Sequence, residues 1–296
     1  MSQVLHPPQG AVRQAVSVAL AEDLLPLGDL TAALLPRAAI GRAAFVSRGH
    51  GVVAGTACVV ETCRQVDHAL VVRVLRDDGT EVAPEDEIIE VRGAMASIVT
   101  SERTALNFLC HLSGIASLTA RYVAAAGARN PATRVLDTRK TTPGLRALEK
   151  AAVRAGGGFN HRGSLSEGVL VKDNHLGHTG ITEAVRRARE LWPGRMVEVE
   201  CDRVEQVREA AEAGATIVLC DNMSPDELRH CAELVRSIAG VSSRTLVEAS
   251  GGISLDTVGE FAAAGADLVS VGALTHSAPV LDVGLDLKAA EVSGLG

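Results

Sequence analysis

The chain has 296 residues, enough for one large or two smaller domains, and 47% of them are hydrophobic but only 2% aromatic, which indicates a globular protein with an aliphatic core. The formal net charge of −7 argues against nucleic acid or an anionic membrane surface as a partner, because such partners attract basic proteins. No stretch approaches the roughly 20 apolar residues of a membrane span. The first ten residues lack the pattern of a secretory signal, and the six cysteines lack zinc-binding spacing. We therefore expect a cytoplasmic protein with reduced thiols.

Before residue 100, the sequence predicts helices mixed with a small antiparallel sheet. Apolar residues recur at helical spacing up to Leu24, which predicts a first amphipathic helix. Asp29 or Thr31 in the motif GDLT is suited to cap a short helical turn. A long helix is then expected to begin with Thr100 or Ser101 as its cap. The other predicted elements are a helix over 58–66 and strand-like runs at 43–48, 51–55, 70–75 and 88–93.

From Arg134 onward, apolar strand-like runs alternate with helical segments. The strand-like runs cover 135–138, 169–174, 196–200, 216–222, 245–252 and 267–272. The helical segments cover 182–191, 204–213, 225–239 and 254–264. Such alternation is typical of a parallel sheet covered by helices. It fits an α/β barrel with fewer than the usual eight strands, and a doubly wound open sheet is the alternative.

Polar residues mark the C-terminal end of nearly every strand-like run. Residues 137–140 follow the first run, and Glu200, Asp221 and Gly272 stand at the ends of later runs. The carboxyl ends of barrel strands meet at one rim, where barrel enzymes carry their catalytic residues. In an open sheet only neighbouring ends would meet. This pattern therefore favours the barrel.

Basic residues gather in two short clusters beside these runs. The clusters contain Arg139, Lys140, His161, Arg162 and Lys172. Cations at strand ends of an acidic protein indicate a pocket for a small, strongly anionic substrate, and solvated surface charge is the alternative. Lys140 or Lys172 could instead form a Schiff base, because neighbouring cations depress the pKa of a lysine. His175 and His178 have no further metal ligands at a suitable spacing, so we interpret them as loop histidines.

Two glycine-containing motifs near the end of the chain are suited to bind phosphate. They are ASGG at 249–252 and VGA at 271–273. Glycine allows the backbone to approach an anion closely, and a helix starting near Ser254 would direct its free N–H groups at it. Tight turns between strand and helix would need glycine equally.

Glu200 and Asp221 are carboxylates at the ends of consecutive runs. They could hold Mg²⁺ directly or through water, bind sugar hydroxyls, or stabilise a developing cation. Alternatively, they are structural partners of the nearby lysines. Glu198 lies two residues before Glu200 and shares its face of the strand. Spacing alone therefore does not decide which of these two glutamates acts.

Taken together and in order, these motifs resemble the nicotinate-nucleotide pyrophosphorylase family, also called the decarboxylating quinolinate phosphoribosyltransferases. The motifs are DTRKTTPGLR (137–146), GGGFNHR (156–162), VKDNH (171–175), VEVE (197–200), LCDN (219–222), EASGG (248–252) and VGALTHS (271–277). GDLT (28–31), GVVAG (51–55) and SERTALNFLCHLSGIA (101–116) extend the likeness to nearly the whole chain.

The resemblance implies an N-terminal α/β open-faced sandwich domain over 1–113, joined by the C-terminal segment 275–296. It implies an incomplete TIM-like α/β barrel over 114–274. The subunits would form a homodimer, with Arg103 reaching the active site of the other subunit; otherwise Arg103 reads as a solvated helix charge. The reaction would join quinolinate to phosphoribosyl pyrophosphate with Mg²⁺, giving nicotinate mononucleotide, pyrophosphate and CO2 in NAD biosynthesis.

The resemblance also assigns roles to individual residues. Quinolinate would be bound by Arg103, Thr138, Arg139, His161, Arg162 and Lys172. Phosphoribosyl pyrophosphate would be bound by Lys140, Lys172, Asn174, Glu200, Asp221, Ser250, Gly251, Gly252, Ser270 and Gly272. Lys140, Glu200 and Asp221 would be the catalytic residues, and the two carboxylates would hold Mg²⁺, directly or through water.

One departure from the family pattern follows Arg162. The family usually has a bulky apolar residue and then glycine, whereas this chain has Gly163 and Ser164. We expect this change to affect the loop around His161 and the affinity for substrate more than the fold.

Two other functions fit the same fold. One is that of the molybdenum-transport-associated relative of this family, and the other is that of a catalytically silent paralogue that binds an anionic metabolite. The combined TRK, HR and KDNH motifs favour the phosphoribosyltransferase over the first. Retention of Glu200, Asp221 and the glycine motifs argues against the second.

Overall fold

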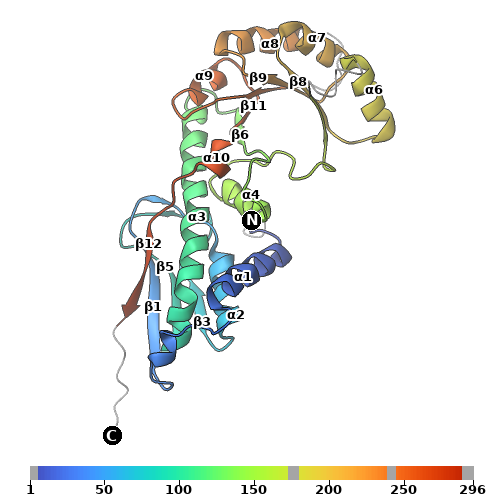
Figure 1. Cartoon of the computed structure of the whole chain (residues 1–296). Helices are drawn as coiled ribbons and strands as arrows, with labels where there is room; N and C mark the ends of the chain where they lie inside the picture. The colour runs from blue at the N-terminus through green and yellow to red at the C-terminus, as the bar shows by residue number, and fades with distance from the viewer. Residues whose placement is uncertain (1–5, 173–179, 239–244, 289–296) are drawn as a thin grey trace. The chain divides into compact units, whose positions relative to one another are not determined.

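The computed structural model describes residues 6–172, 180–238 and 245–288 (Figure 1). The chain divides into two compact units. The described part of the first unit consists of residues 6–120, 142–157 and 277–288. That of the second consists of residues 121–141, 158–172, 180–238 and 245–276. Helix α3 (Met95–Gly127) contributes residues to both units.

The first unit contains an antiparallel sheet with the strand order β12–β1–β5–β3. Its strands are β1 (Ile40–Ser47), β3 (Val71–Val74), β5 (Glu87–Ala94) and β12 (Val283–Lys288). A separate pair joins β2 (Gly51–Val52) to β4 (Glu81–Val82). Strand β12 belongs to the C-terminal segment, and its Val283 pairs with Ser47 of β1. The small antiparallel sheet predicted from the sequence is confirmed.

Helices cover one face of this sheet (Figure 1). The helical elements of the unit besides α3 are α1 (Gln9–Leu24), the 3-10 turn η2 (Ala32–Leu34), α2 (Thr56–Val66) and α4 (Arg146–Ala155). Phe45 of β1 and Ile89 of β5 lie in one buried cluster with Val59 of α2 and Leu109 of α3. Burial of each such side chain contributes about 1.5–3 kcal/mol, so this layer holds the helices on the sheet. The arrangement is the expected open-faced sandwich.

Helix α3 begins earlier than the capping residues predict. Strand β5 ends at Ala94 and the helix starts at Met95. Ser101 donates its hydroxyl to the Ile98 carbonyl at 2.8 Å, and Thr100 donates to the Asp29 carboxylate at 3.0 Å. The prediction of a helix start at Thr100 or Ser101 is wrong, because capping residues are tolerated inside a helix when their hydroxyls find another acceptor.

The predicted cap at GDLT is confirmed. The Asp29 carboxylate accepts the backbone N–H groups of Thr31 and Ala32 at 3.0 and 2.9 Å, at the start of η2. These are two of the donors that a helical turn leaves without internal partners. Among the helices that the structure describes, none is long and apolar enough to cross a membrane.

The described part of the second unit contains six parallel strands in the order β6–β11–β10–β9–β8–β7. They are β6 (Arg134–Leu136), β7 (Val169–Val171), β8 (Val197–Cys201), β9 (Ile217–Asp221), β10 (Leu246–Ser250) and β11 (Leu268–Ser270). The helices among its described residues are α6 (Ile181–Leu191), α7 (Val204–Glu212), α8 (Pro225–Ser237), α9 (Val258–Ala263) and α10 (Ala273–His276). Every strand-like run predicted after Arg134 is therefore a strand.

The strand order identifies an incomplete barrel. Strands β7 to β11 are neighbours in chain order, and β6, which comes first in the chain, lies beside β11, the last. A parallel bridge from Leu136 to Phe159 continues the sheet beyond β6, so the circle stays open between Phe159 and β7. A doubly wound sheet would reverse its strand order, so that alternative is wrong. Helices α6 to α9 lie along the outer side of the strands (Figure 1).

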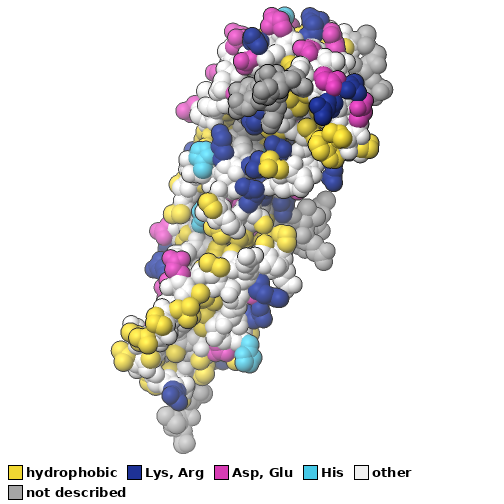
Figure 2. Space-filling view, turned by 45° about the vertical axis from the view of Figure 1, so that its right-hand side comes forward, with side chains coloured by type: hydrophobic (Ala, Val, Ile, Leu, Met, Phe, Trp, Pro, Cys, Tyr) yellow, Lys and Arg dark blue, Asp and Glu magenta, His cyan; other side chains and the backbone are white. Residues whose placement is uncertain are grey.

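The outer helices carry charges of both signs. On the face drawn in Figure 2, Lys and Arg side chains lie among Asp and Glu side chains over the upper part, where α6, α7 and α8 lie. Arg186 of α6 pairs with Glu183, and Arg229 of α8 pairs with Asp226. This upper part of the face therefore carries no continuous basic field.

Candidate active site

A cavity of about 460 Å³ lies at the carboxyl ends of the strands of the second unit. Its lining residues are Thr138, Arg139, Lys140, His161, Arg162, Leu170, Lys172, Glu200, Leu219, Asp221, Asn222, Glu248, Ser250, Gly251, Gly252 and Ser270. Most of the residues that the sequence singles out are among them. The curvature of the sheet explains this convergence, because the polar ends of separate strands meet at one rim.

Three of the predicted site residues have other positions. Arg103 is exposed on α3 in the first unit, and Asn174 lies outside the described residues, as do His175 and His178. Gly272 follows β11 beside the cavity. A Cβ atom at this position would lie 3.1 Å from Cδ of Lys140 and 3.0 Å from Nε2 of His276. Glycine here allows Lys140 to pass close to the backbone.

Buried Asp137 connects the two basic clusters. Its carboxylate accepts the side-chain amide of Asn160 at 2.6 Å and the backbone N–H of His161 at 2.9 Å. On the other side of Asp137, the backbone N–H of Lys140 donates to the Thr138 hydroxyl at 3.0 Å. The residue after β6 thus ties both basic segments to the same wall of the cavity.

Two guanidinium groups create a local excess of positive charge. Arg162 donates to the Gly168 carbonyl at 2.9 Å, and its Nε is buried with no hydrogen-bond partner among the described residues. Burial and then the charge of Arg139 lower the pKa of Arg162, while Glu198 acts in the opposite direction. Two neighbouring guanidinium groups are suited to bind carboxylates in a bidentate manner.

Two carboxylates face these cations from neighbouring strands. Glu200 of β8 forms an ion pair with Lys172. Burial and then the charge of Glu200 raise the pKa of Asp221 at the end of β9, while Lys172 and Lys140 oppose this shift. Lys172 is therefore paired with a carboxylate rather than placed in an apolar pocket, which is unlike the Schiff-base arrangement.

The glycine turn after β10 is constrained by close contact as well as by backbone conformation. Gly251 has φ of +96°, and a Cβ atom there would lie 2.2 Å from Oδ1 and 2.8 Å from the backbone N of Asn222. Gly252 has φ of +60° but open space around it. Asn222 also has a positive φ of 56°, and it donates its side-chain amide to Asp221 at 2.7 Å. These contacts couple the glycine turn to Asp221.

Helix α9 starts later than predicted. It begins at Val258 rather than near Ser254. The backbone N–H of Ser254 donates to the Thr257 hydroxyl at 3.0 Å, in a turn that precedes the helix. The prediction of a helix N-terminus with free N–H groups at Ser254 is therefore wrong, because the Thr257 hydroxyl already accepts the N–H of Ser254. Backbone donors for a phosphate at this end of β10 would come from Gly251 and Gly252.

The sequence reasoning missed a buried acidic pair beneath the cavity. Glu198 of β8 and Glu248 of β10 are both fully buried. Nε2 of His161 lies 2.9 Å from Glu198 and 3.8 Å from Glu248. Both glutamates stand in the motifs VEVE and EASGG, at strand positions whose neighbours are apolar. The signal in the sequence that could have revealed this pair is a charged residue between apolar residues of a buried strand. The structure also distinguishes the two glutamates of β8, because Glu200 lines the cavity and Glu198 lies beneath it.

The segment that departs from the family pattern forms a hydrogen-bonded turn. The backbone N–H of Gly163 donates to the Glu167 carboxylate, and the hydroxyls of Ser164 and Ser166 lie 3.0 Å apart. Glu167 immediately precedes Gly168, the residue that accepts from Arg162. The departure therefore lies next to a predicted quinolinate-binding residue, and its effect on affinity stays a prediction.

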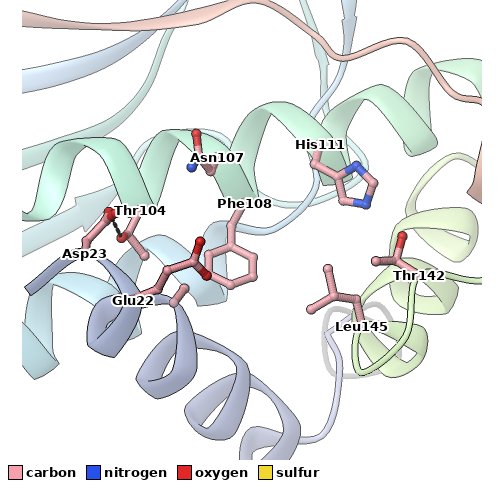
Figure 3. Close-up of a pocket in the computed structure, with 9 residues that line it drawn as sticks. Glu22, Asp23, Thr104, Asn107, Phe108, His111, Thr142 and Leu145 are labelled. Atoms are coloured by element: carbon pink, nitrogen blue, oxygen red, sulfur yellow. Dashed lines mark hydrogen bonds between the residues drawn. The ribbon is translucent and has the colours of Figure 1, made fainter. Parts of the chain in front are cut away.

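The first unit has a smaller cavity of about 330 Å³ between α1, α3 and the segment before α4 (Figure 3). Phe108 and His111 of α3 line it together with Glu22 of α1. Nε2 of His111 lies 2.9 Å from the buried Glu149, whose other oxygen accepts the N–H of Thr142. Among the residues that the structure describes, neither Lys nor Arg lines this cavity, so the cavity in the second unit is the better candidate for an anionic substrate.

Comparisons with known proteins assign both parts of the chain. Residues 29–113 match the model of the N-terminal domain of quinolinate phosphoribosyl transferase, and residues 115–286 match that of its C-terminal domain. The chain is 39% identical to the nicotinate-nucleotide pyrophosphorylase (carboxylating) of Mycobacterium leprae, over 94% of this chain and 97% of that protein. It is 40% identical to a probable enzyme of the same name from Bacillus subtilis, over 88% of each chain. The solved structure of the nicotinate-nucleotide pyrophosphorylase from Francisella tularensis superimposes with a TM-score of 0.90 at 34% identity, covering 96% of this chain and 99% of that one.

Proposed function

The chain belongs to the quinolinate phosphoribosyltransferase family, and we propose on that basis that it transfers a phosphoribosyl group from phosphoribosyl pyrophosphate to quinolinate. The reaction releases pyrophosphate and CO2 and gives nicotinate mononucleotide for NAD biosynthesis. The observation that carries this proposal is the cavity of the second unit, where a basic wall, two carboxylates and a glycine turn meet. A planar dicarboxylate and a phosphorylated sugar are the ligands that such a site would hold side by side.

Quinolinate binds against the basic wall of the cavity. Arg139 and Arg162 hold its two carboxylates, with His161, Thr138 and Lys172 around them. The depressed pKa of Arg162 beside Arg139 supports this assignment, because an anion between two like charges removes their repulsion. The ion pair between Lys172 and Glu200 must open or be shared when the substrate enters.

Phosphoribosyl pyrophosphate occupies the carboxylate side of the cavity. The 5′-phosphate accepts N–H groups from Gly251 and Gly252, next to Ser250 and Ser270, and Lys140 meets the pyrophosphate. Glu200 and Asp221 bind ribose hydroxyls and stabilise the positive charge that develops on the sugar as pyrophosphate leaves. Binding both substrates in one cavity aligns the ring nitrogen of quinolinate with the anomeric carbon.

Magnesium fits the same pair of carboxylates. Burial and then the charge of Glu200 raise the pKa of Asp221, so the two carboxylates are close enough to repel each other, and a divalent cation would relieve that repulsion. Mg²⁺ is usually held by one or two carboxylates together with substrate phosphates. Glu200 and Asp221 would hold the ion, and when bound it would supply positive charge to neutralise the leaving pyrophosphate.

The homodimer and the cytoplasmic location are also part of the proposal. Arg103 lies on the exposed face of α3, where it can reach another subunit. We expect it to contact quinolinate bound to the other subunit, which adds a further cation for a dianionic substrate.

The decisive experiment measures nicotinate mononucleotide formed from phosphoribosyl pyrophosphate and Mg²⁺ with either quinolinate or nicotinate. We expect product with quinolinate but not with nicotinate, because nicotinate lacks the second carboxylate that Arg139 and Arg162 would bind. Product from nicotinate, or from neither substrate while phosphoribosyl pyrophosphate still binds, would refute the proposal. The second outcome would favour the transport-associated relative or a silent paralogue.

A further inference from the structure

Lys140, which we expect to meet the pyrophosphate, lies within residues 137–145, where neither helix nor strand fixes the backbone. This segment joins β6 to α4, and Lys140 itself is exposed. An exposed lysine has much conformational freedom to lose when it binds an anion. Contacts that hold its backbone and the start of its side chain in advance therefore strengthen the binding of that anion.

Two threonine hydroxyls hold the backbone of Lys140. Its N–H donates to the Thr138 hydroxyl at 3.0 Å, and its carbonyl accepts the Thr275 hydroxyl at 2.9 Å. The first bond spans two residues and fixes only the local turn. The second comes from α10, which is 135 positions further along the chain, and the Thr275 side chain is buried. Thr275 therefore fixes where Lys140 lies relative to the end of β11.

The turn from β11 into α10 also contacts the side chain of Lys140. A Cβ atom at Gly272 would lie 3.1 Å from Cδ of Lys140, so the lysine side chain passes directly over this glycine. The backbone N–H of Thr275 donates to the Gly272 carbonyl at 3.1 Å. One hydrogen-bonded turn thus holds the backbone of Lys140 through Thr275 and leaves room for its side chain at Gly272.

A purely local role for the Thr275 hydroxyl is the alternative. A threonine in a helical turn often donates to a carbonyl three or four residues earlier, and the Thr275 hydroxyl lies 3.3 Å from the Gly272 carbonyl. The distance to the Lys140 carbonyl is shorter, at 2.9 Å, and closer to the usual length of an O–H···O bond. The hydroxyl has one proton, so the geometry favours the bond to Lys140.

We propose that Thr275 is a positioning residue that holds Lys140 where its ammonium group meets the pyrophosphate of phosphoribosyl pyrophosphate. Among the described residues that line the cavity, Lys140 is present and Thr275 is not. Thr275 therefore acts on the substrate through Lys140 and not by touching it. The inference rests on the proposed function and assigns a role to Thr275 of the motif VGALTHS.

Three substitutions separate positioning of Lys140 from a general loss of stability. Thr275→Val keeps the shape of the side chain but removes the hydroxyl, whereas Thr275→Ser keeps the hydroxyl and loses the methyl group. Thr133→Val is the matched control. Thr133 is also buried in the second unit, and its hydroxyl donates to the Ala266 carbonyl at 2.7 Å. It precedes β6, at the end of the strand opposite to the cavity.

The assay measures steady-state formation of nicotinate mononucleotide with each substrate varied in turn. We expect Thr275→Val to raise KM for phosphoribosyl pyrophosphate about tenfold, which corresponds to the loss of about one hydrogen bond. KM for quinolinate should change much less, and Thr275→Ser should recover most of the loss. Thr133→Val should keep both KM values. The two valine variants should unfold at similar temperatures, because each loses one buried hydrogen bond.

A double-mutant cycle tests whether Thr275 acts through Lys140. In a Lys140→Ala background, Thr275→Val should lower kcat/KM for phosphoribosyl pyrophosphate by less than about twofold, because the group that it positions is absent. A further tenfold loss in that background would overturn the inference, as would equal KM values for Thr275→Val and Thr133→Val. Failure of the proposed function would look different, because the wild-type enzyme would then form no nicotinate mononucleotide from quinolinate.

Discussion

Substitution of Gly251 by alanine tests whether the glycine turn positions Asp221. The new Cβ atom would lie 2.2 Å from Oδ1 and 2.8 Å from the backbone N of Asn222. The second contact is with backbone, so rotation of a side chain cannot remove it. Asn222 is tied to Ser250 by its backbone N–H at 2.9 Å and to Asp221 by its side-chain amide at 2.7 Å. Relief of the clash therefore displaces the end of β9.

The cost has two parts. A φ of +96° costs an alanine about 1–2 kcal/mol relative to glycine, and overpacking against a fixed neighbour adds about 1–3 kcal/mol. The smaller entropy of alanine in the unfolded chain returns about 0.4–1 kcal/mol. We expect Gly251→Ala to lower the free energy of unfolding by about 2–4 kcal/mol. Gly194→Ala has a φ of +84° and open space, so its cost should be about 1 kcal/mol.

Denaturant unfolding followed by the fluorescence of Trp192 measures this difference. Trp192 is the sole tryptophan and belongs to the second unit, as do both glycines. In steady-state assays, Gly251→Ala should also raise KM for phosphoribosyl pyrophosphate by about tenfold, equivalent to about 1.4 kcal/mol. Gly194→Ala should leave KM near the wild-type value. Equal destabilisation by the two substitutions would refute the argument from close contact, and an unchanged KM would refute the coupling to Asp221.

Three further predictions concern charged groups. Arg139→Ala should raise KM for quinolinate at least tenfold, the cost of about 1.5–3 kcal/mol for a lost charged hydrogen bond, without loss of folding; unchanged turnover at low quinolinate would contradict the site. Arg103→Ala and Lys172→Ala subunits, each inactive alone, should regain some activity when mixed and allowed to exchange, and no recovery would place the whole site within one subunit. As pH rises from 5 to 8, the melting temperature of Glu248→Gln should increase relative to that of the wild type. Burial and then the charge of Glu198 raise the carboxyl pKa from its ordinary 4.5 to about 8 in the fold, so in this window the unfolded wild type binds fewer protons and its stability declines. Parallel pH profiles of the two melting temperatures would refute this.

Much of the barrel was predictable because its signal is local. Apolar runs separated by amphipathic segments predicted all six strands that the structure describes in the second unit. The same patterns predicted its main helices, with errors mostly at their ends. Those errors have a common cause: Thr100, Ser101 and Ser254 are good capping residues, but their polar groups bond to other partners in the folded chain. A capping preference depends on local sequence, whereas tertiary contacts determine which hydrogen-bond partner the side chain has in the folded chain.

The basic character of the site was also readable from the sequence. Arg139, Arg162 and Lys172 follow or end strand-like runs, and parallel strands bring such ends together once they close into a barrel. The sequence therefore determined the fold class, the family and the chemistry of the substrate pocket. These features depend on residue type and on position along the chain, which the sequence records directly.

The tertiary structure alone decided which side chains meet beneath that pocket. Glu198 and Glu248 are 50 positions apart in the chain, on strands that are not paired with each other, yet both face His161. Strand alternation predicts that each points to one face of the sheet, but not how deep it lies or which residue stands opposite. Those depend on the curvature of the barrel and on the segment that pairs beyond β6. Burial and proximity arise only when the sheet curves into the open barrel, and together they favour a neutral Glu248.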